Sequence, residues 1–382
     1  MRVEIERVTS EKQLKTFIRV PWTVYAEDGN WVPWLYFERL DFFNKKKNTF
    51  FEHAEADYFI ARRDGQAVGT IAAILNHRYN EFQQSNVAHF GAFEVMDDKE
   101  AALALLEAAT KWARARGVEK LVGPMTFSTN DETGTLIEGF DSAPVVMMTY
   151  NPPYYPEFME AAGFQKAMDL YAWLADLEEL VNNMPEKVER VVNKVRDRFK
   201  LEIRPIRLDK WDEEVAQIKR IYNSAWERNW GFVPMTDAEI EHLAENLKLI
   251  LDPAVVFMVE HEGEAVGFSL TIPDVNQPLQ RIRPQPSLLS SYLGVARMYL
   301  NRYKTDLVRV LALGVVAKYR GRGVDALLYY DTVRKAHEQG YRWAEASWIL
   351  ESNDMMNRAI ALMGGEIYKR YRVYEKEVGG EE

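Results

Sequence analysis

The sequence predicts an α/β (α+β) protein made of two tandem copies of one domain. The main observation is an internal repeat. The segment FMVEHEGEAVG at 257–267 follows the pattern of FIARRDGQAVG at 59–69 with a constant offset of 198 residues. A helix-like segment follows each of them, at 99–116 and at 325–339, and the glycine directly after it is a typical helix stop. A length of 382 residues also suits two domains better than one core. The same order of elements in both halves therefore indicates a duplicated domain.

The first copy is predicted to span residues 1–178 as a β-rich α/β domain. Its first 56 residues are crowded with aromatic side chains, which is typical of a loop or helix pair packed over a core. Asp64 and Gly65 separate two apolar runs, and Asp-Gly between such runs is a strong signal for a β-hairpin. The predicted strands are 58–61, 67–75, 89–95, 121–125 and 171–174.

A linker helix is predicted over residues 179–200, followed by the second copy over 201–382. Apolar side chains recur at helical spacing in the linker, which favours a helix packed across the domain junction over a flexible tether. The second copy carries an insert, Pro273–Asp306, that the first copy lacks. The insert is proline-rich and then apolar and basic, and three interpretations are open: a helix packed over the domain, a lid over the substrate, or a contact with a membrane surface.

Residues 308–334 predict a strand, a glycine-rich loop and a helix in direct succession. The run 308–316 is almost entirely apolar and β-branched, the pattern of a strand buried on both faces. The loop 318–323 carries three cations and two glycines, and helical spacing begins at Val324. Glycines let successive backbone N–H groups converge, and a helix N-terminus adds unpaired donors and a partial positive charge. These features predict an anion site suited to a phosphate or diphosphate.

The segment Val315–Val324, VVAKYRGRGV, resembles the acyl-CoA loop of the GNAT (N-acetyltransferase) superfamily, in which an Arg/Gln-x-x-Gly-x-Gly/Ala loop holds the CoA diphosphate on backbone amides. Arg320 takes the first position of that pattern and Gly323 the fourth, whereas Asp325 stands where the family has glycine or alanine. The Asp325 carboxylate is expected to weaken CoA binding unless it turns outward. The resemblance implies acetyl-CoA as co-substrate, held by Leu313, Val315, Val316, Arg320, Gly321, Arg322, Gly323, Val324 and Asn353.

The same resemblance implies a fold. Each of the two tandem GNAT-like domains is expected to be a twisted mixed, mostly antiparallel sheet flanked by helices and splayed between its fourth and fifth strands to admit CoA. The first copy is expected to be a degenerate member, because the sequence EVMDD at 94–98 replaces the glycine loop and its carboxylates repel a diphosphate.

Asn353 follows the predicted strand 343–350 and matches a GNAT asparagine that touches the pantetheine arm, although it fits a helix N-cap equally well. Family members often have a tyrosine seven residues later as general acid, and that position is Ile360 here. Tyr371 is the candidate replacement, with Tyr368 and Tyr292 as alternatives.

Direct acyl transfer to an amine needs a base that removes an ammonium proton, and the positioning of the two substrates supplies most of the rest. Glu345 and Glu351 are the catalytic candidates for that base, because they lie on or directly after the predicted strand. Acids at such positions are also commonly solvated or ion-paired.

A polar loop follows the predicted strand 121–125, where α/β proteins tend to bind ligands. Its short polar side chains suit either a turn or an acceptor site, and the acids would attract a cationic amine. The predicted substrate-binding residues are Ser128, Asn130, Glu132, Trp226 and Trp230.

Composition excludes several other classes of protein. A net charge of −10 argues against a nucleic-acid partner, and the absence of cysteine excludes disulfides and thiolate chemistry. The histidines have no metal-ligand spacing, so no metal is predicted. No secretory signal and no transmembrane segment is indicated, and a cytoplasmic location is expected.

The predicted function is transfer of an acetyl or acyl group from acyl-CoA to the amine of a small molecule or peptide, by a monomer or a homodimer. An aminoacyl transferase on the same doubled fold is one alternative. A non-catalytic acyl-CoA sensor or scaffold is another, because Ile360 and Asp325 depart from the family pattern.

Overall fold

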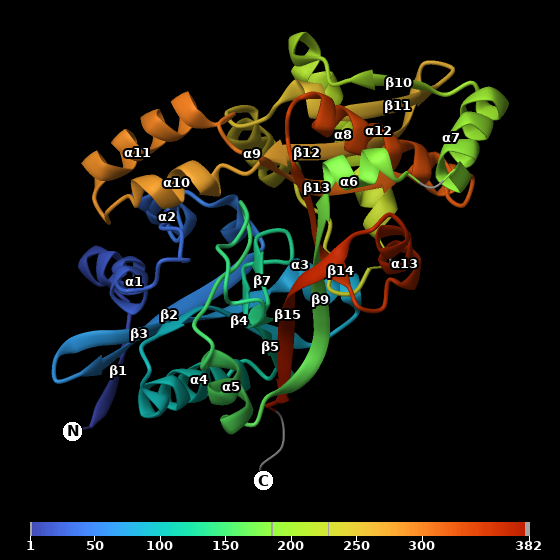
Figure 1. Ribbon diagram of the computed structural model, residues 1–382. Coiled ribbons are helices and arrows are strands. Elements are labelled where there is room, and N and C mark those ends of the chain that lie inside the picture. Colours follow the sequence, from blue (N-terminus) through green and yellow to red (C-terminus); the bar gives the residue numbers. More distant parts are fainter. Residues whose placement is uncertain (1, 185, 228, 379–382) are drawn as a thin grey trace. The chain divides into compact units, whose positions relative to one another are not determined.

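The computed structural model describes residues 2–184, 186–227 and 229–378 (Figure 1). Its contacts divide the chain into two compact units, each with a mixed sheet flanked by helices, which confirms the predicted fold class. Unit 1 consists of Met1–Leu170, Leu279–Met298 and Lys369–Glu382, and unit 2 of Tyr171–Pro278 and Tyr299–Tyr368. The predicted boundaries at residues 178 and 200 describe a sequence repeat rather than compact bodies, and they stay a prediction.

The sheet of unit 1 confirms the predicted hairpin. Asp64 and Gly65 form its turn, and both have the positive φ that this turn needs. The strand order is β1 (Val3–Arg7), β2 (Ala54–Arg63), β3 (Gln66–Asn76), β4 (Val87–Val95), β5 (Lys120–Gly123) and β15 (Glu366–Glu377). All neighbours are antiparallel except β4 and β5. The other strands that begin in unit 1 are β6 (Met125–Thr126), β7 (Glu132–Thr133), β8 (Thr135–Glu138) and β9 (Gln165–Asp176).

Both faces of this sheet are covered by helices, so successive strand residues are buried in different clusters. Ile71 and Ala73 pack with Leu105 of α4 on one face, and Ala72 and Ile74 pack with Phe17 of α1 on the other. Figure 1 shows α1 and α4 on opposite sides of β2 and β3. The helices of this unit's N-terminal segment are α1 (Glu11–Val24), α2 (Tyr36–Phe42), η1 (Thr49–Glu52), α3 (His77–Gln83), α4 (Lys99–Arg114) and α5 (Tyr155–Ala161).

Unit 2 repeats this arrangement. Its strand order is β14 (Trp343–Leu350), β13 (Leu307–Val315), β12 (Glu264–Pro273), β11 (Phe257–His261) and β10 (Glu202–Pro205), with only β13 and β14 parallel. The helices are α6 (Leu177–Asn182), α7 (Glu186–Phe199), η2 (Leu208–Lys210), α8 (Trp211–Trp226), α9 (Asp237–Lys248), η3 (Pro253–Val255), η4 (Ala317–Tyr319), α12 (Val324–Glu338) and α13 (Asp354–Leu362). Helices α7 and α12 pack on one face and α8 packs on the other. The range predicted as one linker helix, 179–200, contains the end of α6 and the whole of α7, and both helices belong to unit 2.

In both units the fourth strand separates from the fifth. The parallel ladder of β13 and β14 covers only Leu307–Val310 and Trp343–Ala346, and both strands continue beyond it. In unit 1 the ladder of β4 ends at His89, six residues before the strand does. Each fourth strand also contains an extra residue against the third, Leu311 in β13 and one residue between Gly91 and Glu94 in β4. Such bulges bend a strand and redirect its side chains. The splay implied by the GNAT resemblance is therefore present in both units.

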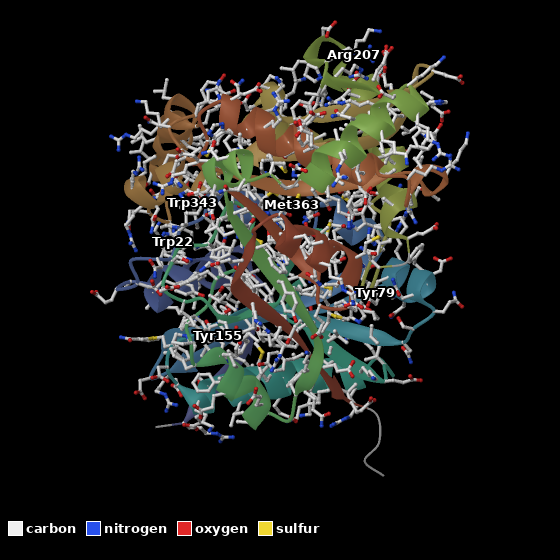
Figure 2. All side chains as sticks on the ribbon, turned by 45° about the vertical axis from the view of Figure 1, so that its right-hand side comes forward. Trp22, Tyr79, Tyr155, Arg207, Trp343 and Met363 are labelled. Atoms are coloured by element: carbon white, nitrogen blue, oxygen red, sulfur yellow. The ribbon has the colours of Figure 1, made fainter. Side chains whose placement is uncertain are left out.

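The insert of the second copy forms two helices, α10 (Asn276–Ile282) and α11 (Leu288–Asn301). Residues Leu279–Met298 belong to unit 1, where α10 and α11 lie beside α2 (Figure 1). The Tyr36 N–H donates to Ser291 Oγ over 2.7 Å, and the Trp22 indole, labelled in Figure 2, donates to the Pro284 carbonyl over 2.9 Å. The insert therefore forms helices as predicted, but Leu279–Met298 pack within unit 1 and not over the second copy that carries the insert.

Candidate functional site

The predicted anion loop connects β13 to α12 without a side-chain cap. Gly321 and Gly323 have φ of 66° and 84°, which other residues rarely adopt. Gly323 is the N-cap residue of α12, and among the described residues no side chain caps the first N–H groups of that helix. A Cβ at Gly323 would come within 2.7 Å of Val195 Cγ2 on α7, so glycine is also required for space. The start of α12 thus offers backbone donors to a ligand.

A cavity of about 400 Å³ lies between this loop and α7. Lys194 and Arg198 on α7 and Arg322 on the loop supply three cations to its lining, against one carboxylate from Asp325. The complete lining is Val191, Lys194, Val195, Arg198, Phe199, Gly321, Arg322, Gly323 and Asp325. A surplus of positive charge next to free backbone N–H groups suits a phosphorylated ligand.

The other predicted cofactor residues support the loop through hydrogen bonds and core packing. The Arg320 guanidinium donates to the carbonyls of Val315 and Ser224, so it ties the loop to the ends of β13 and α8. Val315 and Val324 are buried in the core beneath α12, and Leu313 and Val316 pack against the same cluster. Their predicted contact with the cofactor stays a prediction.

Two tryptophans border the splay between β13 and β14. A Cβ at Gly314 of β13 would come within 2.7 Å of the Trp226 ring, which stacks on Tyr222 with centroids 4.6 Å apart. Trp348 of β14 has a φ of 55°, and its indole N–H is buried without a hydrogen-bond partner among the described residues. A strained aromatic residue with an unsatisfied donor is typical of a ligand site. Sequence reasoning missed Trp348, because nothing in its local pattern indicates a positive φ. Trp230, also predicted to bind substrate, is half-buried in the turn after α8.

The carboxyl of Glu345 lies in a buried polar network. Its Oε2 is 3.7 Å from Arg309 Nε on the neighbouring strand, and both side chains are almost fully buried. The hydroxyl of Ser347 donates to Oε2 over 2.9 Å, and that of Tyr368 donates to Oε1 over 3.3 Å. These contacts hold the carboxylate at the point where β13 and β14 begin to separate. Its predicted role as base stays a prediction.

The residues after β14 are partly used for helix capping. Asn353 is the N-cap of α13, and its side-chain oxygen accepts a hydrogen bond from the Met356 N–H over 3.2 Å. Glu351 is half-buried in the turn before it. Ile360 is buried within α13, and its aliphatic side chain has no proton to donate. Asn353 therefore acts as a cap, and its contact with pantetheine stays a prediction.

The predicted polar substrate loop belongs to unit 1. The Ser128 hydroxyl donates to Asp131 over 2.7 Å and accepts from the Asn130 N–H over 3.1 Å, the contacts of a side-chain-stabilised turn. Glu132 forms an ion pair with Arg39 of α2, whose guanidinium lies 4.2 Å from the centre of the Trp34 ring. Trp226 and Trp230 belong to unit 2, so the predicted substrate residues form two separate sets.

Tyr371, the third catalytic candidate, also belongs to unit 1. It is fully buried in β15 opposite Leu136, and its Cβ would lie 3.1 Å from a Cβ placed on Gly134. Glu345 and Glu351 belong to unit 2. The structure therefore does not bring the three predicted catalytic residues together within one unit, and the role of Tyr371 stays a prediction.

A buried carboxyl that sequence reasoning did not select lies near the end of β4. Glu94 Oε2 accepts hydrogen bonds from the hydroxyls of Tyr25 over 2.6 Å and Tyr155 over 3.0 Å. Tyr155, at the start of α5, is labelled in Figure 2, and Tyr25 stacks on Trp31. Burial raises the pKa of Glu94 to about 8, although the two hydroxyl donors act in the opposite direction. Its only sequence signal is an acid near the end of an apolar strand.

The start of α4 in unit 1 is occupied by its own side chains. Asp98 is the N-cap, and its carboxylate accepts from the Ala101 N–H over 3.1 Å. Arg63 donates to both oxygens of Asp98 over 2.6 and 2.8 Å, and to Glu100 over 2.9 Å. This closed network contrasts with the uncapped start of α12.

No group of three or more histidine, aspartate or glutamate side chains is placed to hold a metal ion in residues 2–184, 186–227 and 229–378.

Comparison with solved structures gives the class of fold. A tandem GNAT protein from the clavulanic acid biosynthesis pathway aligns over 100% of both chains with a TM-score of 0.55 and 13% sequence identity. The protein thus has a tandem GNAT fold. No protein-family model matches the sequence.

Two curated relatives align over nearly the whole chain. The bacterial ceramide synthase of Caulobacter vibrioides is 36% identical over 377 residues, which cover 97% of this chain and 96% of the relative. Protein YghO of Escherichia coli is 32% identical over 373 residues, or 97% of this chain and 94% of the relative. The chain belongs to the family of these two proteins, and together with its GNAT fold the membership supports an acyltransferase.

Proposed function

We propose that the protein transfers an acyl group from acyl-CoA to the primary amine of a long-chain amino alcohol. The observation that carries the proposal is the uncapped start of α12 at Gly323, which borders a cavity lined by three cations. This arrangement suits the diphosphate of CoA, because main-chain N–H groups and a helix dipole stabilise its charge without any further side chain.

We place the pantetheine arm of the co-substrate between the splayed strands β13 and β14. Beyond Val310, the edge of β13 facing β14 is outside their parallel ladder, and this edge leads to the loop at Gly323. The pantetheine arm carries two amide groups, which match the backbone donors and acceptors of a strand edge. The Trp226 and Trp348 rings would then border the thioester end.

The reaction needs few catalytic groups. The amine nitrogen attacks the thioester carbonyl, the C–N bond forms, the C–S bond breaks and CoA leaves as the thiolate. A base takes the proton that the attacking nitrogen loses. Glu351 is the proposed base, because it is half-buried directly after β14, and Glu345 is proposed to hold the two strands in position through Arg309. Ile360 carries no acidic group, so the thiolate would take its proton from water.

The name of one relative supports the proposed acceptor class. A ceramide is the amide of a fatty acid with a long-chain amino alcohol, and the relative of Caulobacter vibrioides is named as a ceramide synthase. The same product class agrees with direct transfer to an amine.

Calorimetric titration with acetyl-CoA and with a long-chain acyl-CoA tests the co-substrate. Gly323→Asp is expected to abolish binding, because it adds a carboxylate and a side chain against Val195. Lys194→Gln with Arg322→Gln has no such clash, and we expect an affinity loss of roughly tenfold or more together with a weaker salt dependence. Gly29→Asp is the control, since nothing lies within 4 Å of its Cβ position. Unchanged affinity in the Lys194/Arg322 double variant would refute this site.

A non-catalytic acyl-CoA binder is the second candidate, favoured by the buried Ile360 in place of the family's tyrosine. Release of free CoA thiol, measured with long-chain amino alcohols and a panel of short amines, separates the two. Binding without thiol release with any acceptor would favour the non-catalytic function.

A further inference from the structure

Helix α11 presents large apolar side chains to solvent along one face. Leu289 is 72% exposed and Leu293 51% exposed, one helical turn apart. Leu288 and Tyr292 on the same turns are 49% and 61% exposed, and Leu300 on the last turn is 76% exposed. We call Leu288, Leu289, Tyr292 and Leu293 the apolar face of α11. All four residues belong to unit 1.

The direction of this face is set by small residues on the opposite side. Ser291 is fully buried and accepts a hydrogen bond from the Tyr36 N–H over 2.7 Å. A Cβ on Gly294 would touch Leu35 and Pro284 at 3.4 Å, so the helix backbone lies close to α2. Soluble helices normally turn their leucines inward. Here serine and glycine face inward, and the leucines are left outside.

The charge of the surrounding segment differs from that of the rest of the chain. No aspartate or glutamate occurs from Val275 to Thr305, although the chain contains 58 acids. The same stretch carries five cations, Arg281, Arg283, Arg297, Arg302 and Lys304. A positive segment on a chain of net charge −10 is suited to an anionic partner.

We propose that α11 docks the protein on a bilayer that contains anionic phospholipid, with its apolar face in the interfacial region. Exposed leucines flanked by arginine are the pattern of a helix that lies in the plane of the interface, and tyrosine is enriched at that depth. The helix has 14 residues, and no helix in the described part of the chain is long and apolar enough to span a membrane. Its contact with the bilayer is therefore peripheral.

The proposal goes beyond the acyl-transfer reaction, because membrane binding can be measured without either substrate. The two also agree, since a long-chain amino alcohol dissolves in the bilayer on which the protein would dock.

Co-sedimentation with vesicles tests the proposal. The full chain is expected to bind vesicles of phosphatidylcholine with phosphatidylglycerol more tightly than vesicles of phosphatidylcholine alone. Leu289→Asp with Leu293→Asp should lower binding at least roughly tenfold, because it removes apolar area and adds charge of the wrong sign. The matched control is Leu249→Asp with Leu362→Asp, which changes two leucines that are 55% and 74% exposed outside α11.

Two results would overturn the proposal. One is vesicle binding that is absent, or that the Leu289/Leu293 variant and its control lower equally. The other is a dimer in light scattering that the Leu289/Leu293 variant dissociates, because a second copy of the chain would then cover the apolar face. Retained CoA affinity in the variant, measured by calorimetry, shows that the fold is intact and separates this test from that of the proposed function.

Discussion

At the scale of single residues, burial changes the pKa of the Glu94 carboxyl, and no sequence motif indicates this change. Its position on β4 corresponds to Gly314 on β13, since each pairs with the residue after the matching glycine of the third strand. In unit 2 the Trp226 ring fills the space beside Gly314, and in unit 1 the Tyr25 hydroxyl contacts Glu94 instead. At equivalent positions, unit 2 thus has a glycine covered by a tryptophan ring, and unit 1 has a buried acid.

Glu94 should make stability depend on pH. Its folded-state pKa is about 8, above the ordinary value of 4.5, so the folded protein holds a proton that the unfolded chain has released. The stabilisation is present below pH 4.5 and is lost as pH rises through 8, by on the order of a few kcal/mol. We expect the melting temperature to fall between pH 7 and 9. Burial lowers the pKa of His89 to about 4, so His89 stays neutral throughout that window.

The control for this prediction is Glu94→Gln, which keeps an acceptor for both tyrosine hydroxyls without a titrating proton. Its melting temperature should be nearly flat over the same window, whereas Glu4→Gln, an exposed site, should behave like the natural protein. A parallel decline in all three proteins would contradict the assignment to Glu94.

At the scale of elements, a buried ion pair joins β13 and β14 near the end of their parallel ladder. Arg309 and Glu345 are direct neighbours in the last part of the parallel ladder before the strands separate. A charge left alone in this environment is not solvated, so removal of either partner should be costly.

Glu345→Gln is expected to destabilise the protein by roughly 3 kcal/mol, because it leaves the Arg309 charge buried without its partner. Arg309→Met combined with Glu345→Leu should cost less than that, since it removes both charges. Denaturant unfolding measures the difference. Loss of thiol release in Glu345→Gln at unchanged stability would instead support its role as base.

At the scale of the whole molecule, the two copies share one topology but differ at the start of the helix that follows the fourth strand. Both fourth strands are bulged and splayed. Helix α12 has a glycine N-cap, whereas α4 has Asp98, which is paired with Arg63. The proposed donor site is therefore confined to unit 2.

Asp98→Ala tests this division. The loss of the N-cap should cost about 1 kcal/mol of stability and leave the affinity for acyl-CoA unchanged. Thermal unfolding and calorimetry measure the two quantities. A change in the affinity for acyl-CoA would contradict the confinement of the donor site to unit 2.

Sequence alone determined the features that depend on neighbouring residues. The hairpin at Asp64-Gly65, its repeat at 257–267 and the strand–loop–helix around Gly323 follow from periodicity and from the conformations that glycine permits. Only the tertiary structure decided the rest. It set Lys194 and Arg198 against the loop, enclosed Glu94 between two tyrosines and turned the leucines of α11 outward. These depend on which surfaces meet, and burial and charge pairing between distant segments leave no period in the sequence.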